Sequence, residues 1–425
     1  MNRDRVDEVV RLRSTPELES GVAKPILRID RKSQLSRTAR GSLILITALI
    51  TFLIALALYS AWHQSSMDAY FVKCRELSES KNWSELARLA ERWSQSEPHV
   101  AEPWLYLAES AEQRGDWEKV VASLDRVPKS DPRRIGALVR KAAMEFEQLN
   151  RPWSGVKTCD EILEVEPRVL LAHKQTIFFY AMTLQRAEMV RRIRRAIQVR
   201  RESPESYVYL MGTSWLYSGS LYRLNTRWLE GDPKSEIFQI AQALQVYATG
   251  AKEDLQVAAE FEQIPPLEEM LKRYPHNLEL VAFVLNQRIS DGDIERVQQL
   301  LTAVPPELAD QDARFWRARA WCQDTLGEFE QAETSLRRAL MIDPYWWQIH
   351  FQLHDLLRRR GELDESARFF KISKLSKALS IEIMALNRST ETLDEQKLCR
   401  SMLELAELIN DDEVAAALRE RIVQP

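Results

Sequence analysis

Two histidines, His350 and His354, have the spacing that most directly suggests chemistry in this chain. They lie four residues apart, so on a helix they would share one face, as zinc-binding histidine pairs do. The run between them, "HFQLH", contains no glutamate that could act as a general base, and no third metal ligand is evident. We therefore expect both rings to pack between helices, and we expect no metal site.

The cysteines and the common catalytic motifs give no sign of an enzyme. No two of the four cysteines form a C-x-x-C pair, which excludes the usual zinc and redox patterns. The chain also lacks a phosphate-binding loop, a dinucleotide-binding fingerprint and a G-x-S-x-G elbow. We expect no enzymatic activity, no catalytic residues and no cofactor. The cysteines are Cys74, Cys159, Cys322 and Cys399.

A basic run, "RRIRRAIQVRR", extends from Arg191 to Arg201. It has two interpretations: a surface for an anionic partner, or a solvated helix face whose charges pair with nearby glutamates, and we favour the second. The whole chain has 59 Lys and Arg against 63 Asp and Glu, a net charge of −4. Such a balance does not indicate a nucleic-acid partner.

The elements that would position any site are helices. The common residues are helix formers, only 12 of the 425 residues are glycine, and the alternation typical of strands is scarce. One pattern recurs, as "GDWEKVVASLDRVPKSDP" from Gly115 and "GEFEQAETSLRRALMIDP" from Gly327. Copies begin near residues 67 and 101 and near 313 and 347, each pair 34 residues apart, and a fifth begins near 278. The sequence predicts an all-α protein made of repeated helical hairpins.

Each recurring residue type has a structural role within the repeat. Ala320 lets two helices approach closely, and Gly327 ends the first helix in a turn where a positive φ costs little. Phe329 is expected to fill the seam between hairpins. Pro344 stops the second helix, because proline lacks an N–H and clashes with the preceding turn.

The period and these residue types resemble the tetratricopeptide repeat (TPR). The resemblance implies a right-handed α-solenoid of about nine or ten hairpins over residues 64–425. It divides into N-terminal repeats at 64–168, degenerate helical repeats at 169–277, C-terminal repeats at 278–380 and a capping hairpin at 381–425. The degenerate part has two interpretations: a bend in the solenoid, or a boundary between two lobes. In a solenoid each hairpin touches only its neighbours, so cysteines 75 or more residues apart are expected to be buried free thiols.

The resemblance also implies that the first helices of successive hairpins line a groove for peptides or partner helices. The groove places of the C-terminal repeats combine arginine with aromatic residues, a composition favoured at binding hot spots. The alternative is that the aromatic residues at the junction of the two repeats only pack between hairpins. The candidate groove residues are Arg314, Arg317, Trp321, Asp324, Tyr345, Trp346, Phe351, Asp355, Arg358 and Arg359.

The N-terminal repeats have different residues at these places. The copy at 101 presents an acidic strip with Glu102, Glu109 and Glu112. The Lys and Asn with which the family clamps C-terminal carboxylates are replaced in the first copy by Phe71 and Arg75. We do not expect that binding mode here.

An uncharged apolar run extends from Gly41 to Trp62, which is long enough to cross a bilayer core of about 30 Å. Residues 1–40 have ten basic and six acidic residues and read as a disordered, basic cytoplasmic tail. The excess of basic residues before the run places the N-terminus in the cytoplasm and the C-terminal part on the other side. A cleaved signal peptide and a buried core helix are the alternatives to a retained transmembrane helix at 41–62.

These features together predict a single-pass, membrane-anchored interaction scaffold. Similar arrangements occur among bacterial envelope proteins, where the repeat domain would be periplasmic and would bind proteins or peptides, such as members of an envelope assembly complex. The alternative is an accessory subunit of a polysaccharide or secretion machinery that holds a glycan or polymer in the groove. Membrane lipid would be contacted through residues 41–62.

Overall fold

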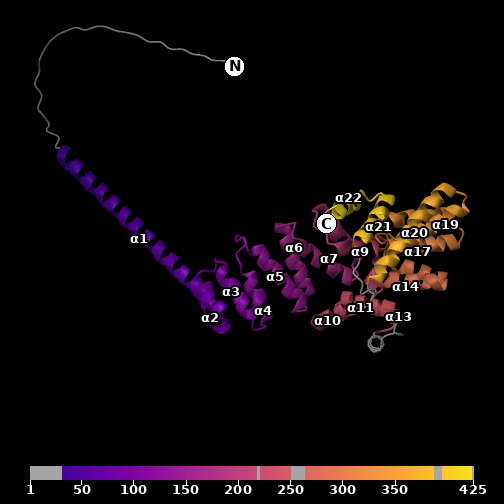
Figure 1. The fold of residues 1–425 in the computed structure, drawn as a ribbon, viewed down its shortest axis with the longest axis horizontal. Coiled ribbons are helices and arrows are strands. Elements are labelled where there is room, and N and C mark those ends of the chain that lie inside the picture. Colours follow the sequence, from indigo (N-terminus) through magenta and orange to yellow (C-terminus); the bar gives the residue numbers. More distant parts are fainter. Residues whose placement is uncertain (1–30, 218–220, 250–263, 387–394, 424–425) are drawn as a thin grey trace, which may run out of the picture. The chain divides into compact units, whose positions relative to one another are not determined.

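The computed structural model describes residues 31–217, 221–249, 264–386 and 395–423 (Figure 1), and in these ranges it consists of helices joined by turns and loops, with no strand. The chain forms two compact units, Met1–Ala69 and Tyr70–Pro425. Residues 1–30, most of the expected cytoplasmic tail, lie outside the described ranges. The all-α expectation is confirmed for the part of the chain that the structure describes.

The first helix, α1 (Arg31–Glu79), contains the apolar run. Its stretch Leu45–Glu79 includes a window with a mean hydropathy of 2.1, none of it buried within the chain, so α1 is long and apolar enough to cross a membrane. A buried core helix does not fit this exposure. The tail was expected to be disordered up to residue 40, but α1 begins at Arg31, because extending an existing helix through Lys, Gln, Leu and Arg is easier than nucleating one.

The N-terminal hairpins follow in close agreement with the repeat. The helix pairs α3 and α4, α5 and α6, and α7 and α8 each pack together. Asp116 accepts a hydrogen bond from the backbone N–H of Lys119 at 3.2 Å, which caps the N-terminus of α4. The helices are α2 (Trp83–Ser96), α3 (Glu102–Glu112), α4 (Trp117–Asp125), α5 (Arg134–Glu147), α6 (Pro152–Val165), α7 (Leu170–Met182) and α8 (Arg186–Gln198).

A left-handed residue recurs in the turn between the two helices of a hairpin. Four glycines have φ between 70° and 83° there, as expected for glycine in a turn that ends a helix: Gly115, Gly292, Gly327 and Gly361. The same conformation occurs without glycine at three turns of the N-terminal and degenerate repeats, which together with Gly115 form a series at 34- or 35-residue intervals. It is found at Lys81 (φ 57°), Asn150 (φ 52°) and Leu184 (φ 58°).

The predicted C-terminal copies begin at the first residues of helices: α14 starts at Leu278, α17 at Ala313 and α19 at Trp347. The helices of this half are α9 (Pro204–Met211), the 3-10 helix η1 (Thr213–Tyr217), α10 (Tyr222–Gly231), α11 (Glu236–Thr249), α13 (Leu267–Arg273), α14 (Leu278–Asp291), α15 (Ile294–Ala303), α16 (Pro306–Ala309), α17 (Ala313–Thr325), α18 (Phe329–Ile342), α19 (Trp347–Arg359), α20 (Leu363–Ala385), α21 (Glu395–Leu408) and α22 (Asp412–Val423).

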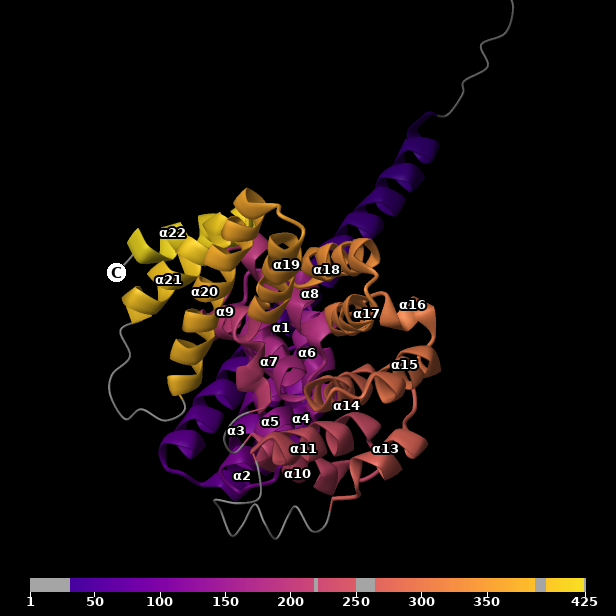
Figure 2. The ribbon, with the colours of Figure 1, turned by 90° about the vertical axis from the view of Figure 1, so that its right-hand side faces the viewer.

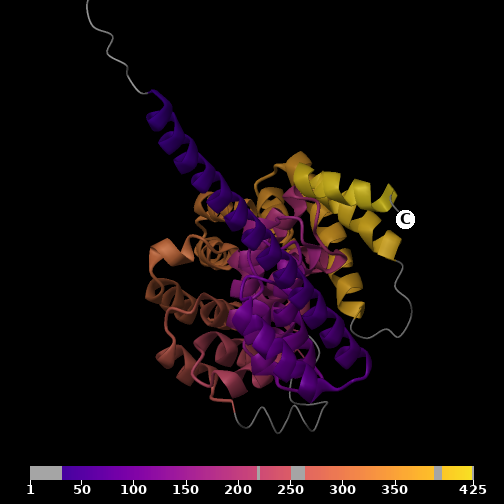
Figure 3. The same cartoon turned by 90° about the vertical axis from the view of Figure 1, so that its left-hand side faces the viewer.

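The C-terminal hairpins fold back onto the central ones. Helix α20 packs on α9 and η1, and α22 packs on α8. Figures 2 and 3 show the yellow C-terminal helices beside magenta helices from the middle of the chain. Arg194 of α8 pairs with Asp411, just before α22, at 2.5 Å. The expectation that each hairpin touches only its neighbours is therefore wrong for this part of the chain, because the curvature of the stack brings the C-terminal helices against the central ones.

One hydrophobic core holds the central and C-terminal helices together. It is continuous from Val156 to Leu418 and therefore includes the degenerate repeats. Trp228 stands at its aromatic centre, with ring centroids 5.4 Å from Phe179 and 5.5 Å from Phe238. The continuity of this core places the degenerate helices and the C-terminal repeats in one packed body.

A candidate partner-binding surface on the C-terminal hairpins

A hollow of about 90 Å³ lies between α17, α18 and α19, and we call it the α17–α19 hollow. Its lining is mainly apolar, with three charged residues. Five of the ten predicted groove residues line it: Trp321, Asp324, Phe351, Asp355 and Arg359. The other lining residues are Ala320, Ala332, Leu336, Gln352 and Leu356.

Helical spacing and small side chains form this hollow. Phe351, Asp355 and Arg359 follow one another at four-residue intervals, so they project from one face of α19. The buried Ala320 and Ala332 have little side-chain volume, which leaves room between α17 and α18. Both helices are held by many interhelical contacts, so the hollow is a feature of a packed surface.

The charges at the hollow compensate one another. Arg359 donates to both oxygens of Asp324, at 2.7 and 2.8 Å, and pairs with Asp355 at 3.3 Å. Arg358, which is exposed, pairs with Asp355 at 2.8 Å. Phe329 does not fill a seam as expected: it is 41% exposed, and the Arg359 guanidinium lies 5.3 Å from its ring centroid. The hollow therefore offers apolar area beside a balanced set of charges.

Arg314 is not on an open groove, which corrects the prediction for this residue. Its side chain, only 14% exposed, pairs with Asp312 and with Glu279, both at 2.6 Å. Arg186 pairs with the same Glu279 at 3.2 Å, and the Tyr217 hydroxyl also donates to it. Burial alone would raise the pKa of Glu279, but Arg314 and Arg186 outweigh it and hold that pKa below its ordinary value. Arg314 thus has its partners inside the chain.

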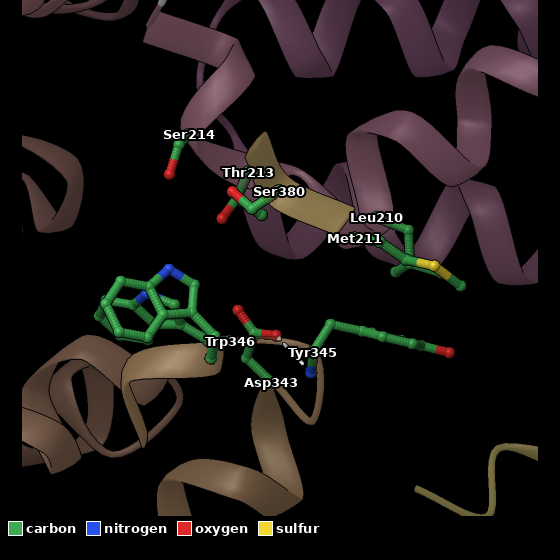
Figure 4. A pocket seen from close by; sticks show the side chains of 9 residues that line it. Leu210, Met211, Thr213, Ser214, Asp343, Tyr345, Trp346 and Ser380 are labelled. Atoms are coloured by element: carbon green, nitrogen blue, oxygen red, sulfur yellow. Dashed lines mark hydrogen bonds between the residues drawn. The ribbon is translucent and has the colours of Figure 1, made fainter. Parts of the chain in front are cut away.

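Tyr345 is buried as well, and its placement favours the packing alternative for the junction aromatics. It is 2% exposed, and its hydroxyl donates to Asp411 at 2.6 Å. Tyr345 and Trp346 line a second hollow of about 10 Å³, which has room for about one water (Figure 4). Asp343 lies in this small hollow and accepts a hydrogen bond from the backbone N–H of Tyr345 at 3.2 Å. Burial raises the pKa of Asp343.

Arg317 has surroundings unlike those of Arg314. It is 9% exposed and donates to two neutral amide oxygens, those of Asn286 and Gln352, both at 3.2 Å. Its guanidinium lies 5.0 Å from the ring centroid of the half-buried Trp346. Burial lowers the pKa of Arg317 to about 10. Arg317 therefore carries a positive charge beneath the surface between α14, α17 and α19.

Asn286 and Gln352 were missed by the sequence reasoning. Asn286 stands at the ninth place of the copy that begins at 278, so the same counting within the repeat would have found it. Gln352 stands at the sixth place of its copy, which was not counted as a groove place. The ion cluster of Arg186, Tyr217 and Glu279 had no local signal, because its members are far apart in the sequence.

The histidines and cysteines are packed as expected. His350 is 3% exposed, with Nε2 2.7 Å from the carbonyl oxygen of Pro344, and His354 Nδ1 lies 2.8 Å from the Ser366 hydroxyl. All four cysteines are buried, and none of them is in a disulfide. Burial raises the pKa of Cys74 to about 11.

The predicted charged surfaces are largely neutralised within the chain. In the basic run, Arg192 pairs with Asp160 and Glu188, Arg194 pairs with Asp411, and Arg200 pairs with Glu420. Pairing was the favoured interpretation, although Arg192 is mostly buried rather than solvated. In the acidic strip, Glu102 pairs with Arg133, Glu112 pairs with Arg140, and Glu109 accepts from Ser78.

No protein-family model and no curated protein matches this chain. Three similar solved structures are a tetratricopeptide repeat protein from Parabacteroides merdae, yeast Tom70 and the APC/C hetero-tetramer Cut9-Hcn1. The first is 13% identical, over 60% of this chain and 98% of that one, with a TM-score of 0.28. Tom70 is 15% identical, over 83% and 80%, with a TM-score of 0.25, and Cut9-Hcn1 is 11% identical, over 83% and 79%, with a TM-score of 0.30.

The class of the protein rests on its helices: paired helices in succession, with a left-handed turn residue every 34 or 35 residues from Lys81 to Leu184 and again from Gly292 to Gly361. This arrangement defines an all-α protein of repeated helical hairpins.

Proposed function

We propose that this chain is an interaction scaffold whose C-terminal hairpins bind a peptide or helix of a partner protein in the α17–α19 hollow. The observation that carries the proposal is the hollow itself, whose charges are balanced and whose aromatic side chains remain accessible. Phe351 is 47% exposed, and Trp321 is partly exposed. Aromatic side chains of this kind supply large contact area on binding.

The proposal can be tested by selecting peptides from a displayed random library on the full chain in detergent micelles. Phe351→Ala should weaken the selected peptides roughly tenfold or more, because an aromatic anchor lost from a binding site costs about 1.4 kcal/mol or more. Phe370→Ala is the matched control: Phe370 is 41% exposed on α20 and does not line the hollow. Equal binding by the two variants would contradict the proposal.

The same hollow offers an aromatic face to a sugar, which supports the alternative of an accessory subunit that binds a glycan or polymer. The partly exposed ring of Trp321 is the feature that favours it. An oligosaccharide array probed with wild type and Trp321→Ala separates the two functions. Binding of an oligosaccharide that Trp321→Ala loses, without any selected peptide, would replace the peptide proposal by the glycan one.

We further propose that α1 anchors the scaffold in a membrane through residues 41–62, with a cytoplasmic N-terminus and residues 64–425 on the extracytoplasmic side. Apolar length and the basic residues before the run support this topology. In a bacterium the repeat domain would be periplasmic and available to an envelope assembly complex. A reporter active only in the cytosol, fused at the C-terminus, should stay silent, and its activity there would contradict the topology.

A further inference from the structure

Arg317 differs from Arg134 and Arg314, two other enclosed arginines, in having no carboxylate partner among the residues that the structure describes. Arg134, which is 8% exposed, donates to Glu161 at 2.6 Å, and Arg314 has Asp312 and Glu279. Within the described residues, Arg317 donates only to the amides of Asn286 and Gln352. A charge withdrawn from water without a counter-charge is costly, so this position gains most from an anion that arrives from outside.

An external anion has access to the guanidinium. Asn286, which accepts from Nη1, is exposed, so the head group lies just beneath the surface. Nη2 makes no hydrogen bond within the described part of the chain, and the Arg317 residue keeps 9% of its surface exposed. A carboxylate can therefore reach Nη2 and form a forked pair by replacing one weakly held amide oxygen.

The guanidinium is adjacent to the α17–α19 hollow. Gln352, which accepts from Arg317 Nε, also lines the hollow. Trp321, another lining residue, lies four residues after Arg317 on α17, which corresponds to about 6 Å along the helix axis. An extended peptide advances about 3.3 Å per residue, so two residues cover that distance.

The volume of the hollow indicates the size of its guest. At about 90 Å³ it is smaller than the apolar cavity of about 150 Å³ that takes benzene. An aliphatic side chain such as that of leucine therefore suits it better than an aromatic ring. Asp324 and Asp355 are paired with Arg359 and Arg358, so these four residues leave no net charge at the hollow to hold a second ion.

The geometry points to Arg317 as the receptor for a carboxylate of an acidic peptide segment, whose aliphatic residue two positions away enters the α17–α19 hollow. This inference rests on the proposed function, since it names the chemistry of the peptide bound there. It assigns the two contacts to separate parts of the surface: Arg317 binds the carboxylate, and the hollow holds the aliphatic side chain.

The test uses peptides selected from the displayed library on the full chain in detergent micelles. Those selected on wild type should be enriched in Asp or Glu two positions from Leu, Ile or Met. Changing that Glu to Gln in a selected peptide should weaken binding to wild type roughly tenfold to a hundredfold, and binding to Arg317→Gln hardly at all. Amidated and free-carboxyl versions of the peptide distinguish a side-chain carboxylate from a chain terminus.

Two results would overturn the inference while leaving the proposed function intact. One is a set of selected peptides that need Phe351 but show no acidic preference, and the other is an equal Glu-to-Gln loss on wild type and Arg317→Gln. Failure of the proposed function is a different result, in which Phe351→Ala has no effect on any selected peptide.

Thermal unfolding gives a second test that needs no ligand. Arg317→Gln should keep or raise the Tm, whereas Arg134→Gln, which leaves Glu161 without its partner, should lower it. A fall with Arg317→Gln as large as that with Arg134→Gln would also overturn the inference.

Discussion

At the scale of single residues, identical side-chain types have opposite roles according to what surrounds them. Arg314 and Arg317 are three residues apart on α17, yet Arg314 closes an ion cluster and Arg317 faces neutral amides. The repeat pattern treats both as groove residues. The difference comes from Glu279 and Asp312, whose carboxylates reach Arg314 and do not reach Arg317.

Asp343 gives a pH-dependent prediction at this scale. Its folded-state pKa is raised above the ordinary value of 3.8, so ionising the carboxylate in the fold costs stability, and this cost grows as the pH rises above 3.8 and is complete above the raised pKa. Asp343→Asn removes the cost and keeps an oxygen for the Tyr345 N–H. We expect a higher Tm than wild type at pH 7, with the gain shrinking as the pH is lowered toward 4. Thermal unfolding across this range measures it, and a gain independent of pH would contradict the explanation.

At the scale of elements, the left-handed turn residue sets where one helix of a hairpin ends and the next begins. Lys81 and Gly115 occupy equivalent turns 34 residues apart, with φ of 57° and 70°. A Cβ added at Gly115 would meet nothing within 4 Å, so only backbone strain separates glycine from other residues there.

This equivalence predicts opposite effects of reciprocal substitutions. Gly115→Ala should lower the free energy of unfolding by about 1 kcal/mol, and Lys81→Gly, at an exposed position, should raise it by a similar amount. Urea unfolding of the two variants checks the pair. Gly136→Ala, inside α5, serves as the control, because it also has open space around an added Cβ but no positive φ; it should stabilise slightly through helix propensity.

The contact between α8 and α22 also belongs to this scale. Asp411 accepts from Arg194 at 2.5 Å and from Tyr345 at 2.6 Å, and it caps α22 through the backbone N–H of Val414 at 3.3 Å. Asp411→Ala should therefore cost about 3 kcal/mol or more of unfolding free energy, because it leaves a partly buried arginine and a buried hydroxyl without their partner.

Urea unfolding measures the cost of Asp411→Ala. The neighbouring Asp412 is exposed, and Asp412→Ala should change the free energy of unfolding by about 0.5 kcal/mol or less. Similar losses for the two variants would mean that the contact with α8 adds little to stability.

At the scale of the whole molecule, the hydrophobic core that joins the central and C-terminal helices does not include α3 and α4. The central and C-terminal helices share one continuous core, closed by the return of α20 and α22. The buried cluster of α3 and α4 is separate and consists largely of alanines with Val120, Leu124 and Val127. Less apolar area is removed from water around α3 and α4 than around Trp228 and Phe238.

Hydrogen exchange should report this difference. We expect backbone amides of α3 and α4 to exchange sooner than those of α17 and α19, because regions with little buried apolar contact open at lower free energy. Exchange followed by mass spectrometry on the full chain in detergent micelles measures it. Equal protection of the two regions would show that residues 70–425 open as a single cooperative unit.

The sequence alone determined the helical class, the starts of α14, α17 and α19, the glycine turns and the apolar length of α1, because each follows from local spacing and backbone preference. It also selected five residues that meet at the α17–α19 hollow, since repeat places project from the same helix face. Only the tertiary structure decided that Arg314 and Tyr345 are enclosed, that Arg317 has no carboxylate partner in the described part of the chain, and that α22 packs on α8. These outcomes depend on residues that are far apart in the sequence, such as Arg194 and Asp411, which are 217 positions apart. The curvature that brings them together results from the packing of many side chains between helices, and no local sequence pattern specifies it.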